Sequence, residues 1–145
     1  MSENREVVMK EITSKTIDYI EKHLNEKFNL DEIAKAVGYS KYHLNRIFSE
    51  ITEKTIHKYI QERRLSASAV KLISSNHPII EIAQEAGYSS QQSYNLAFRK
   101  FYQCSPKAYR KQYTVSLQNI SISISSSTNT WNNIVCLMSK GAMAA

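Results

Sequence analysis

The stretch Leu30-Asp31-Glu32-Ile33-Ala34, with Gly38-Tyr39-Ser40 behind it, decides the fold because the chain repeats this pattern. The second copy, Ile79-Ile80-Glu81-Ile82-Ala83 with Gly87-Tyr88-Ser89, follows 49 residues later, and the copies hold two of the three glycines. A glycine just after an apolar helical run is the usual left-handed helix stop. A serine one or two residues later favours the N-cap of a new helix. Each copy therefore predicts a helix, a tight turn and a second helix.

Apolar spacing along the rest of the sequence extends this pattern to seven helices. The expected helices cover residues 7–24, 30–37, 41–51, 55–74, 79–86, 91–102 and 106–109. The fourth is long, about 30 Å at 1.5 Å per residue, and connects the two repeats. Phe98 follows Phe48 by 50 residues rather than 49, so the second turn holds one extra residue. We predict an all-α, seven-helix domain over residues 7–113, with two helix-turn-helix subdomains joined by a long central helix.

The composition changes after residue 113. Val115, Leu117 and then every second residue from Ile120 to Ile124 are apolar, with polar residues between them, as in a strand. A lone strand has no partners to stabilise it. We expect residues 114–145 to form a non-helical or disordered tail, or the start of a truncated C-terminal domain.

Bulk composition excludes several classes of protein. The chain has 145 residues, 42% of them hydrophobic, which allows a modest core. It has no apolar run of about 18 residues and no apolar signal region at residues 1–6, so we expect a cytoplasmic protein without a membrane span. Cys104 and Cys136 lack metal-ligand spacing, and the four histidines form no HExxH pattern. We expect no metal, no cofactor and no enzymatic activity.

Charge is distributed unevenly along the sequence. Residues 1–36 hold six Lys and Arg against eight Asp and Glu, whereas residues 37–113 hold twelve against five. No acidic residue follows Glu85. This asymmetry favours a polyanionic partner, and duplex DNA fits the paired helix-turn-helix pattern.

The residues expected to read bases lie at the start of the second helix in each repeat, where such helices enter the major groove. In the first repeat these are Tyr42, Asn45 and Arg46, with Ser40, Lys41 and His43 as phosphate or positioning contacts. In the second repeat the base-reading candidates are Gln91, Gln92 and Asn95. Ser90, Arg99, Lys100 and Lys107 are expected to contact phosphates or position the helix. Arg suits guanine, and the amides suit adenine.

The sequence resembles the DNA-binding domain of the AraC/XylS family of transcription regulators over roughly residues 8–113. The matching motifs are Leu30-Asp31-Glu32-Ile33-Ala34, Gly38-Tyr39-Ser40, Tyr42-His43-Leu44, Arg46-Ile47-Phe48, Arg63-Arg64-Leu65, Ile79-Ile80-Glu81-Ile82-Ala83, Gly87-Tyr88-Ser89, Phe98-Arg99-Lys100 and Ser105-Pro106. The stretch Ser90-Gln91-Gln92-Ser93 is similar to the MarA/SoxS/Rob subgroup. The resemblance implies a monomeric regulator, mostly an activator, that places two recognition helices in adjacent major grooves and has RNA polymerase as a further partner.

Four residues depart from the pattern of these relatives. Glu53 and Gln103 stand where the family usually has glycine, and Leu96 and Asn45 stand where the subgroup carries Arg and Gln. We therefore expect the same fold with a different DNA site, in which the cationic first repeat dominates specific contact and the amide-rich second repeat tunes it.

Two other functions are alternatives to this interpretation. A helical adaptor of the transcription machinery, without base readout of its own, predicts an exposed apolar groove in place of polar faces. A DNA-processing enzyme such as a recombinase needs a catalytic Ser, Tyr or acidic cluster on a separate domain, and the tail has no acids.

Overall fold

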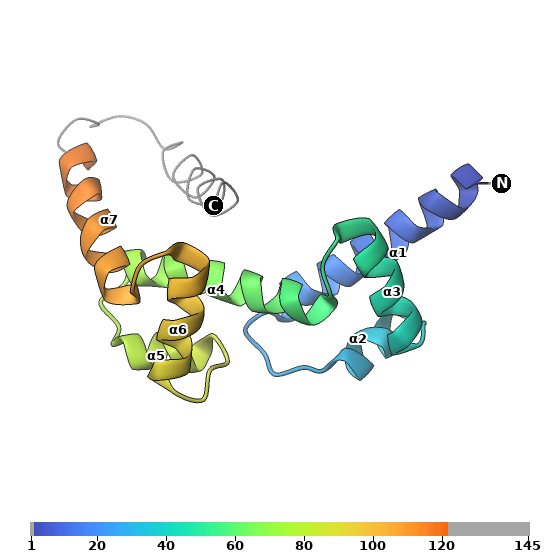
Figure 1. The fold of residues 1–145 in the computed structure, drawn as a ribbon, viewed down its shortest axis with the longest axis horizontal. Coiled ribbons are helices and arrows are strands. Elements are labelled where there is room, and N and C mark those ends of the chain that lie inside the picture. Colours follow the sequence, from blue (N-terminus) through green and yellow to red (C-terminus); the bar gives the residue numbers. More distant parts are fainter. Residues whose placement is uncertain (1, 122–145) are drawn as a thin grey trace. The chain divides into compact units, whose positions relative to one another are not determined.

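The protein is all-helical over the part described by the computed structural model, which covers residues 2–121 and their side chains through Thr114 (Figure 1). The helices are α1 Ser2–His23, α2 Leu30–Val37, α3 Lys41–Thr52, α4 Ile56–Ser74, α5 Ile79–Glu85, α6 Gln91–Tyr102 and α7 Pro106–Ser121. The seven-helix prediction is thus confirmed for this part of the chain. The chain forms two compact units that divide after Arg64, within α4.

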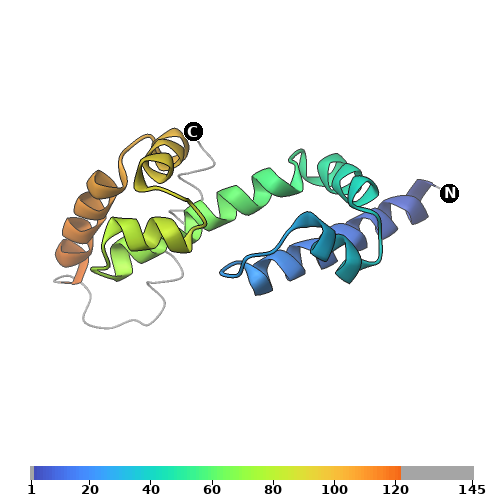
Figure 2. The same cartoon turned by 90° about the horizontal axis from the view of Figure 1, so that it is seen from below.

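In the first unit, α2 and α3 pack on α1 and on each other (Figure 2). The core consists of fully buried aliphatic and aromatic side chains, among them Ile20, Ile33, Leu44, Phe48 and Ile56. Each such side chain contributes about 1.5–3 kcal/mol on removal from water. This burial holds one side of α3 against the protein and leaves the opposite side exposed.

Arg63 and Arg64, near the middle of α4, bind α1 and the loop that follows it. The Arg63 guanidinium donates from Nε to Glu21 Oε1 at 2.7 Å and from Nη2 to Oε2 at 3.0 Å. These bonds hold the pKa of Glu21 below its usual range. Arg64 donates to the backbone oxygens of Leu24 and Glu26 at 3.3 and 3.0 Å. The loop after α1 is thereby tied to α4.

The second unit is built on a cluster of aromatic rings. Tyr94, Phe98 and Tyr109 are buried with aliphatic side chains of α4 and α5, and their rings pack at centroid distances of 5.3–5.6 Å. The Tyr94 hydroxyl donates to Ser68 Oγ at 2.9 Å, and burial raises the pKa of Tyr94 to about 12. From α7, Arg110 donates to the backbone oxygens of Leu72 and His77 at 2.8 and 2.7 Å. The ring contacts and the Tyr94 bond hold the inner face of α6, and the Arg110 bonds hold α7 against α4 and the loop before α5.

The two repeated turns share one closing bond. Gly38 and Gly87 have φ of 85° and 87°, the left-handed conformation expected of them. The next residue donates back across the helix end, Tyr39 to Ala34 O and Tyr88 to Ala83 O, both at 3.0 Å. This 6→1 bond is the closure of a Schellman motif. Ser40 caps α3 directly after the first turn, whereas Ser90 caps α6 after one extra residue, Ser89.

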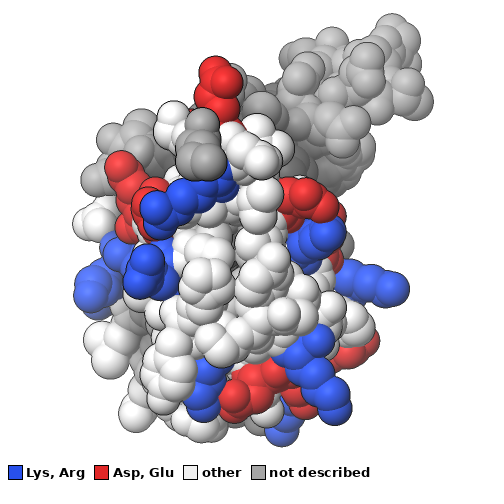
Figure 3. Space-filling view, turned by 90° about the vertical axis from the view of Figure 1, so that its right-hand side faces the viewer, with Lys and Arg blue, Asp and Glu red and all other residues white. Residues whose placement is uncertain are grey.

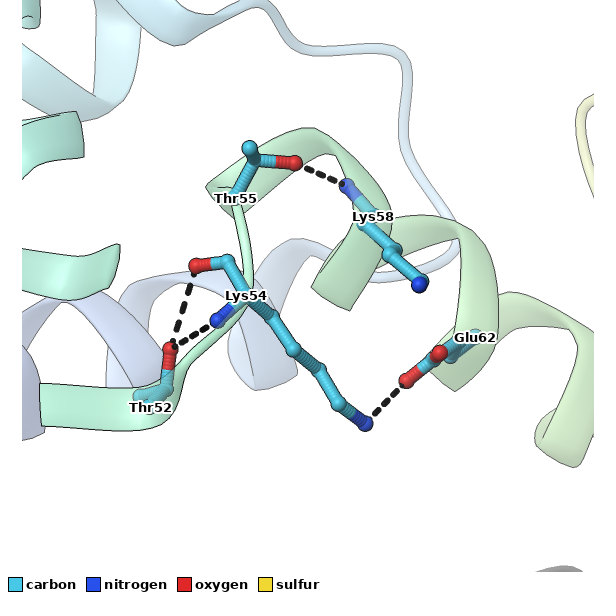
Figure 4. Close-up of polar contacts among 5 residues, drawn as sticks. All are labelled: Thr52, Lys54, Thr55, Lys58 and Glu62. Carbon is cyan, nitrogen blue, oxygen red and sulfur yellow. Dashed lines mark hydrogen bonds and ion pairs between the residues drawn. The ribbon is translucent and has the colours of Figure 1, made fainter. Parts of the chain in front are cut away.

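Two non-glycine residues end α3 and α6 in the left-handed region. Glu53 after α3 has φ of 60°, and Gln103 after α6 has φ of 61°. Around Glu53, Lys54 N donates to Thr52 Oγ1 at 3.3 Å and Lys54 Nζ pairs with Glu62 at 2.5 Å (Figure 4). Thr55 Oγ1 accepts from Lys58 N at 3.1 Å and caps α4 (Figure 4). These side-chain bonds hold the α3–α4 junction in a conformation that glycine adopts more readily.

The strand predicted after Thr114 is wrong for the residues that the structure describes. The alternating pattern predicts a strand over residues 115–124, but residues 115–121 belong to α7, and the remaining three lie outside the described residues. Ser105 Oγ caps α7 by accepting from Ala108 N at 3.1 Å, and no Gly or Pro occurs between Lys107 and Ser121 to end the helix. A helix once started continues at little cost, whereas a lone strand lacks partners. The expected disordered tail beyond residue 121 is likewise outside the described part.

Glu53→Gly should stabilise the protein. Glycine removes the steric conflict of a Cβ at positive φ, so the free energy of unfolding is expected to rise by about 1 kcal/mol. Urea denaturation followed by circular dichroism measures the change. Glu53→Ala is the matched control, because it removes the same carboxylate but keeps the Cβ. A Gly variant no more stable than the Ala variant would contradict the strain assigned to this residue.

Candidate nucleic-acid interface

The first candidate reading surface is the outer face of α3. Ser40 Oγ accepts from His43 N at 3.3 Å and sets the start of the helix. Leu44, Ile47 and Phe48 are buried on the inner side, and this leaves Tyr42, His43 and Arg46 exposed on the outer side. Tyr42 is 80% exposed, and Arg46 follows it by one turn, so the two share one face. The structure brings these two predicted base-reading residues together.

Lys41 lies beside this face but is already engaged by the protein. Its Nζ pairs with Asp31 at 3.2 Å and lies 5.7 Å from the ring centroid of Tyr42. The bond to the Asp31 carboxylate raises the pKa of Lys41. A phosphate would have to compete with Asp31 for this ammonium group. Lys41 therefore suits a positioning contact better than base readout.

A groove of about 400 Å³ adjoins Arg46 between α1 and α3. Val8, Met9 and Ile12 line it from α1, and His43, Arg46 and Ile47 line it from α3. Arg5 lines the same groove and adds a second guanidinium beside the α3 face. Sequence reasoning missed Arg5 because the helix was expected to begin at residue 7. The signal available was the helix-compatible run from residue 2 onward, since α1 begins at Ser2.

The second candidate reading surface is the outer face of α6. Ser90 Oγ accepts from Ser93 N at 3.1 Å and caps the helix, while Tyr94 and Phe98 bury its inner side. The exposed residues follow one another at helical spacing along the outer side. They are Gln92, Leu96, Arg99 and Lys100. Gln91 is half-buried at the edge of this face.

The side-chain oxygens of Asn45 and Asn95, two residues expected to read bases, are turned into the protein. Asn45 is half-buried, and its Oδ1 accepts from Ile56 N at 3.1 Å, so it caps the first turn of α4. The Oδ1 atom of Asn95, 50 residues later, is also buried but has no donor among the described residues. The residue matching Ile56 at this spacing is Pro106, which has no backbone N–H. Both asparagines thus turn their oxygens into the protein, and only Asn45 finds a partner.

The remaining residues predicted to contact phosphates are exposed cationic side chains of the second unit. Arg99 and Lys100 occupy the last turn of α6, and Lys107 is exposed in the first turn of α7.

The side of the molecule on which α1 begins carries Lys and Arg interspersed with Asp and Glu around an uncharged band (Figure 3). That face therefore carries charges of both signs and is not a one-sign patch. No described helix has the length and apolar character needed to cross a bilayer.

Comparison with known proteins places the chain in a family. A family profile described as a helix-turn-helix domain matches residues 33–112. Regulatory protein SoxS of Salmonella typhimurium is 39% identical over 100 residues, 69% of this chain and 94% of that protein. Transcriptional regulator Rob of the same organism is 42% identical over 93 residues, 64% of this chain but 32% of that protein.

Solved structures agree with the sequence relatives. An AraC-type transcriptional regulator from Chromobacterium violaceum superposes with a TM-score of 0.68 at 25% identity, covering 71% of this chain and 92% of that one. The xylose-binding transcription activator xylR gives 0.61 at 35% identity, covering 66% of this chain and 25% of that one. The protein belongs to the AraC-type helix-turn-helix family, in the group of SoxS and Rob. It is a DNA-binding transcription regulator.

Asn45→Ala should destabilise the protein more than Asn95→Ala does. Removing the Asn45 oxygen leaves the Ile56 N–H without its capping bond, which costs about 1–2 kcal/mol. The same change at Asn95 removes an oxygen that has no donor, so its loss should be smaller. Urea denaturation of both variants measures the difference, and the shared substitution matches the loss of side-chain volume. Equal losses at the two positions would contradict the capping role of Asn45.

Proposed function

We propose that the protein binds specific duplex DNA sites by inserting α3 and α6 into adjacent major grooves, and that it activates transcription from those sites. One observation carries the proposal. Each helix begins at a serine cap behind the same left-handed turn and presents an exposed outer face while its inner face is buried. A major groove accepts a helix in this way, with the residues of its N-terminal half against base edges.

In the first groove, Arg46 would supply the main base contact. Its planar guanidinium can donate twice to guanine O6 and N7, the commonest specific contact of this kind. Tyr42, one turn earlier on the same face, would contact the neighbouring base or sugar. Ser40, Lys41 and His43 would position the helix against the backbone, where the N-terminal amides of α3 favour a phosphate. Arg5, which lines the groove beside Arg46, would add a phosphate contact from α1.

In the second groove, an amide replaces the guanidinium as the leading polar group. Gln92 is exposed near the start of α6 and can bond adenine N6 and N7 with its carboxamide. Gln91 would assist from the edge of the face. Ser90, Arg99, Lys100 and Lys107 would hold the phosphates, which makes affinity fall with salt. Because Gln92 suits adenine and Arg46 suits guanine, the second groove should favour A·T pairs and the first groove G·C pairs.

The chain carries both reading helices itself, which supports action as a monomer, since simpler helix-turn-helix proteins need a dimer to present two. The family relationship supports a cytoplasmic regulator that contacts RNA polymerase as an activator. The relatives are regulators and not enzymes, which supports a function without catalysis. The family relationship supports duplex DNA as the partner.

Arg46→Ala should weaken specific binding by about 1–3 kcal/mol and relax the preference at one base pair. Fluorescence anisotropy with a duplex selected by the protein measures the affinity, and binding to its single-base variants measures the preference. Lys22→Ala, in the last turn of α1, is the control because it removes one exposed positive charge away from the α3 face. An Arg46→Ala variant with unchanged affinity and sequence preference would contradict the proposal.

A further inference from the structure

Leu96 is an apolar side chain at the centre of a polar reading face. It is 71% exposed, although the other large apolar side chains of α6 pack against the core. Gln92 precedes it by four residues, and Arg99 and Lys100 follow it by three and four, so all four lie on one face of the helix. Packing among the described residues does not explain a leucine at this position.

The matched position in the first unit shows what the leucine replaces. Phe48 corresponds to Phe98 at a spacing of 50, and on the same spacing Arg46 corresponds to Leu96. Glu53 and Gln103, which both have positive φ, confirm this register in the structure. Arg46 is the residue of α3 best able to bond guanine. At the matched position of α6, Leu96 has an isobutyl side chain, which cannot form hydrogen bonds. The two helices must differ in the base edges they accept at this point.

The chemistry of a leucine limits what it can recognise in a major groove. The thymine C5-methyl is the one apolar feature that the four base pairs present there. A leucine against guanine O6 and N7, or against the amino group of cytosine, would strip water from these groups without replacing the hydrogen bonds. Leucine can therefore attract thymine through methyl contact and disfavour G·C pairs through desolvation.

We propose that Leu96 is a specificity-determining residue that contacts a thymine C5-methyl group in the groove read by α6. Gln92, on the same face one turn earlier, bonds the adenine of a neighbouring pair, so α6 selects a short A·T-rich step. The guanidinium of Arg46 gives α3 the opposite preference. This inference rests on the proposed insertion of α6 into DNA and deepens it.

Replacing thymine by deoxyuridine tests the contact, because it removes the methyl group and leaves every hydrogen-bonding group in place. The probe is the duplex that the full chain enriches from a random pool, with deoxyuridine placed in one half-site at a time. Burial of one methyl group corresponds to about a fourfold change in affinity. We expect affinity to fall by about fourfold when the half-site read by α6 is substituted.

Two variants test whether the loss of affinity caused by deoxyuridine depends on Leu96. Leu96→Ala is expected to bind the thymine and deoxyuridine duplexes equally, and its exposed position predicts unchanged folding by circular dichroism. Ile80→Ala is the matched control, since Ile80 is an apolar side chain of α5 that is 47% exposed and lies off the α6 face. It should keep the fourfold difference.

The outcomes separate this inference from the proposed function. Specific binding by the wild-type chain with no response to deoxyuridine in either half-site overturns the role of Leu96 and leaves the proposed function standing. A fourfold effect that persists in Leu96→Ala also overturns the role of Leu96. Failure of the wild-type chain to enrich any sequence overturns the proposed function itself.

Discussion

The left-handed turn at Gly38 and Gly87 is the constraint on which both reading surfaces depend. Each glycine lets the following tyrosine N–H close back on the preceding helix at 3.0 Å, so the chain reverses within two or three residues. The next helix must then start at a serine cap, with its N-terminal amides free of the preceding helix. Burial of one side of α3 and α6 fixes which side faces outward. The turn, the cap and the core together decide which residues can meet DNA.

The same scaffold produces two unlike readers. The first unit has the shorter turn, a guanidinium on its outer face and an asparagine that caps the next helix through Ile56 N at 3.1 Å. The second has an extra residue in its turn, a leucine in place of the guanidinium and an asparagine oxygen without a donor, because Pro106 starts α7. The two units share the same turn and the same order of helices but differ in the residues on their outer faces. The asymmetry suits a DNA site whose halves differ.

Much of this arrangement follows from local sequence signals. The glycine stops, the serine caps and the buried positions Leu44, Phe48 and Phe98 could be predicted, because they depend on residues close by in the chain. The capping bond of Asn45 could not, because its partner lies 11 residues away across a helix junction. The extension of α7 to Ser121 could not be predicted, because alternating apolar residues indicate a strand. The same residues can also continue a helix that has already started. The exposure of Leu96 depends on which side of α6 the core covers.

The central claim is that one chain reads two successive major grooves, and chemical footprinting with dimethyl sulfate and hydroxyl radicals tests it most directly. The duplex selected by the protein would be probed at a stoichiometry of one chain per duplex, verified by analytical ultracentrifugation. We predict two protected patches on one face of the duplex, about 10–10.5 base pairs apart from centre to centre. Guanine N7 should be protected only in the patch read by α3. A single patch, or two patches that appear only when two chains are bound, would contradict the account.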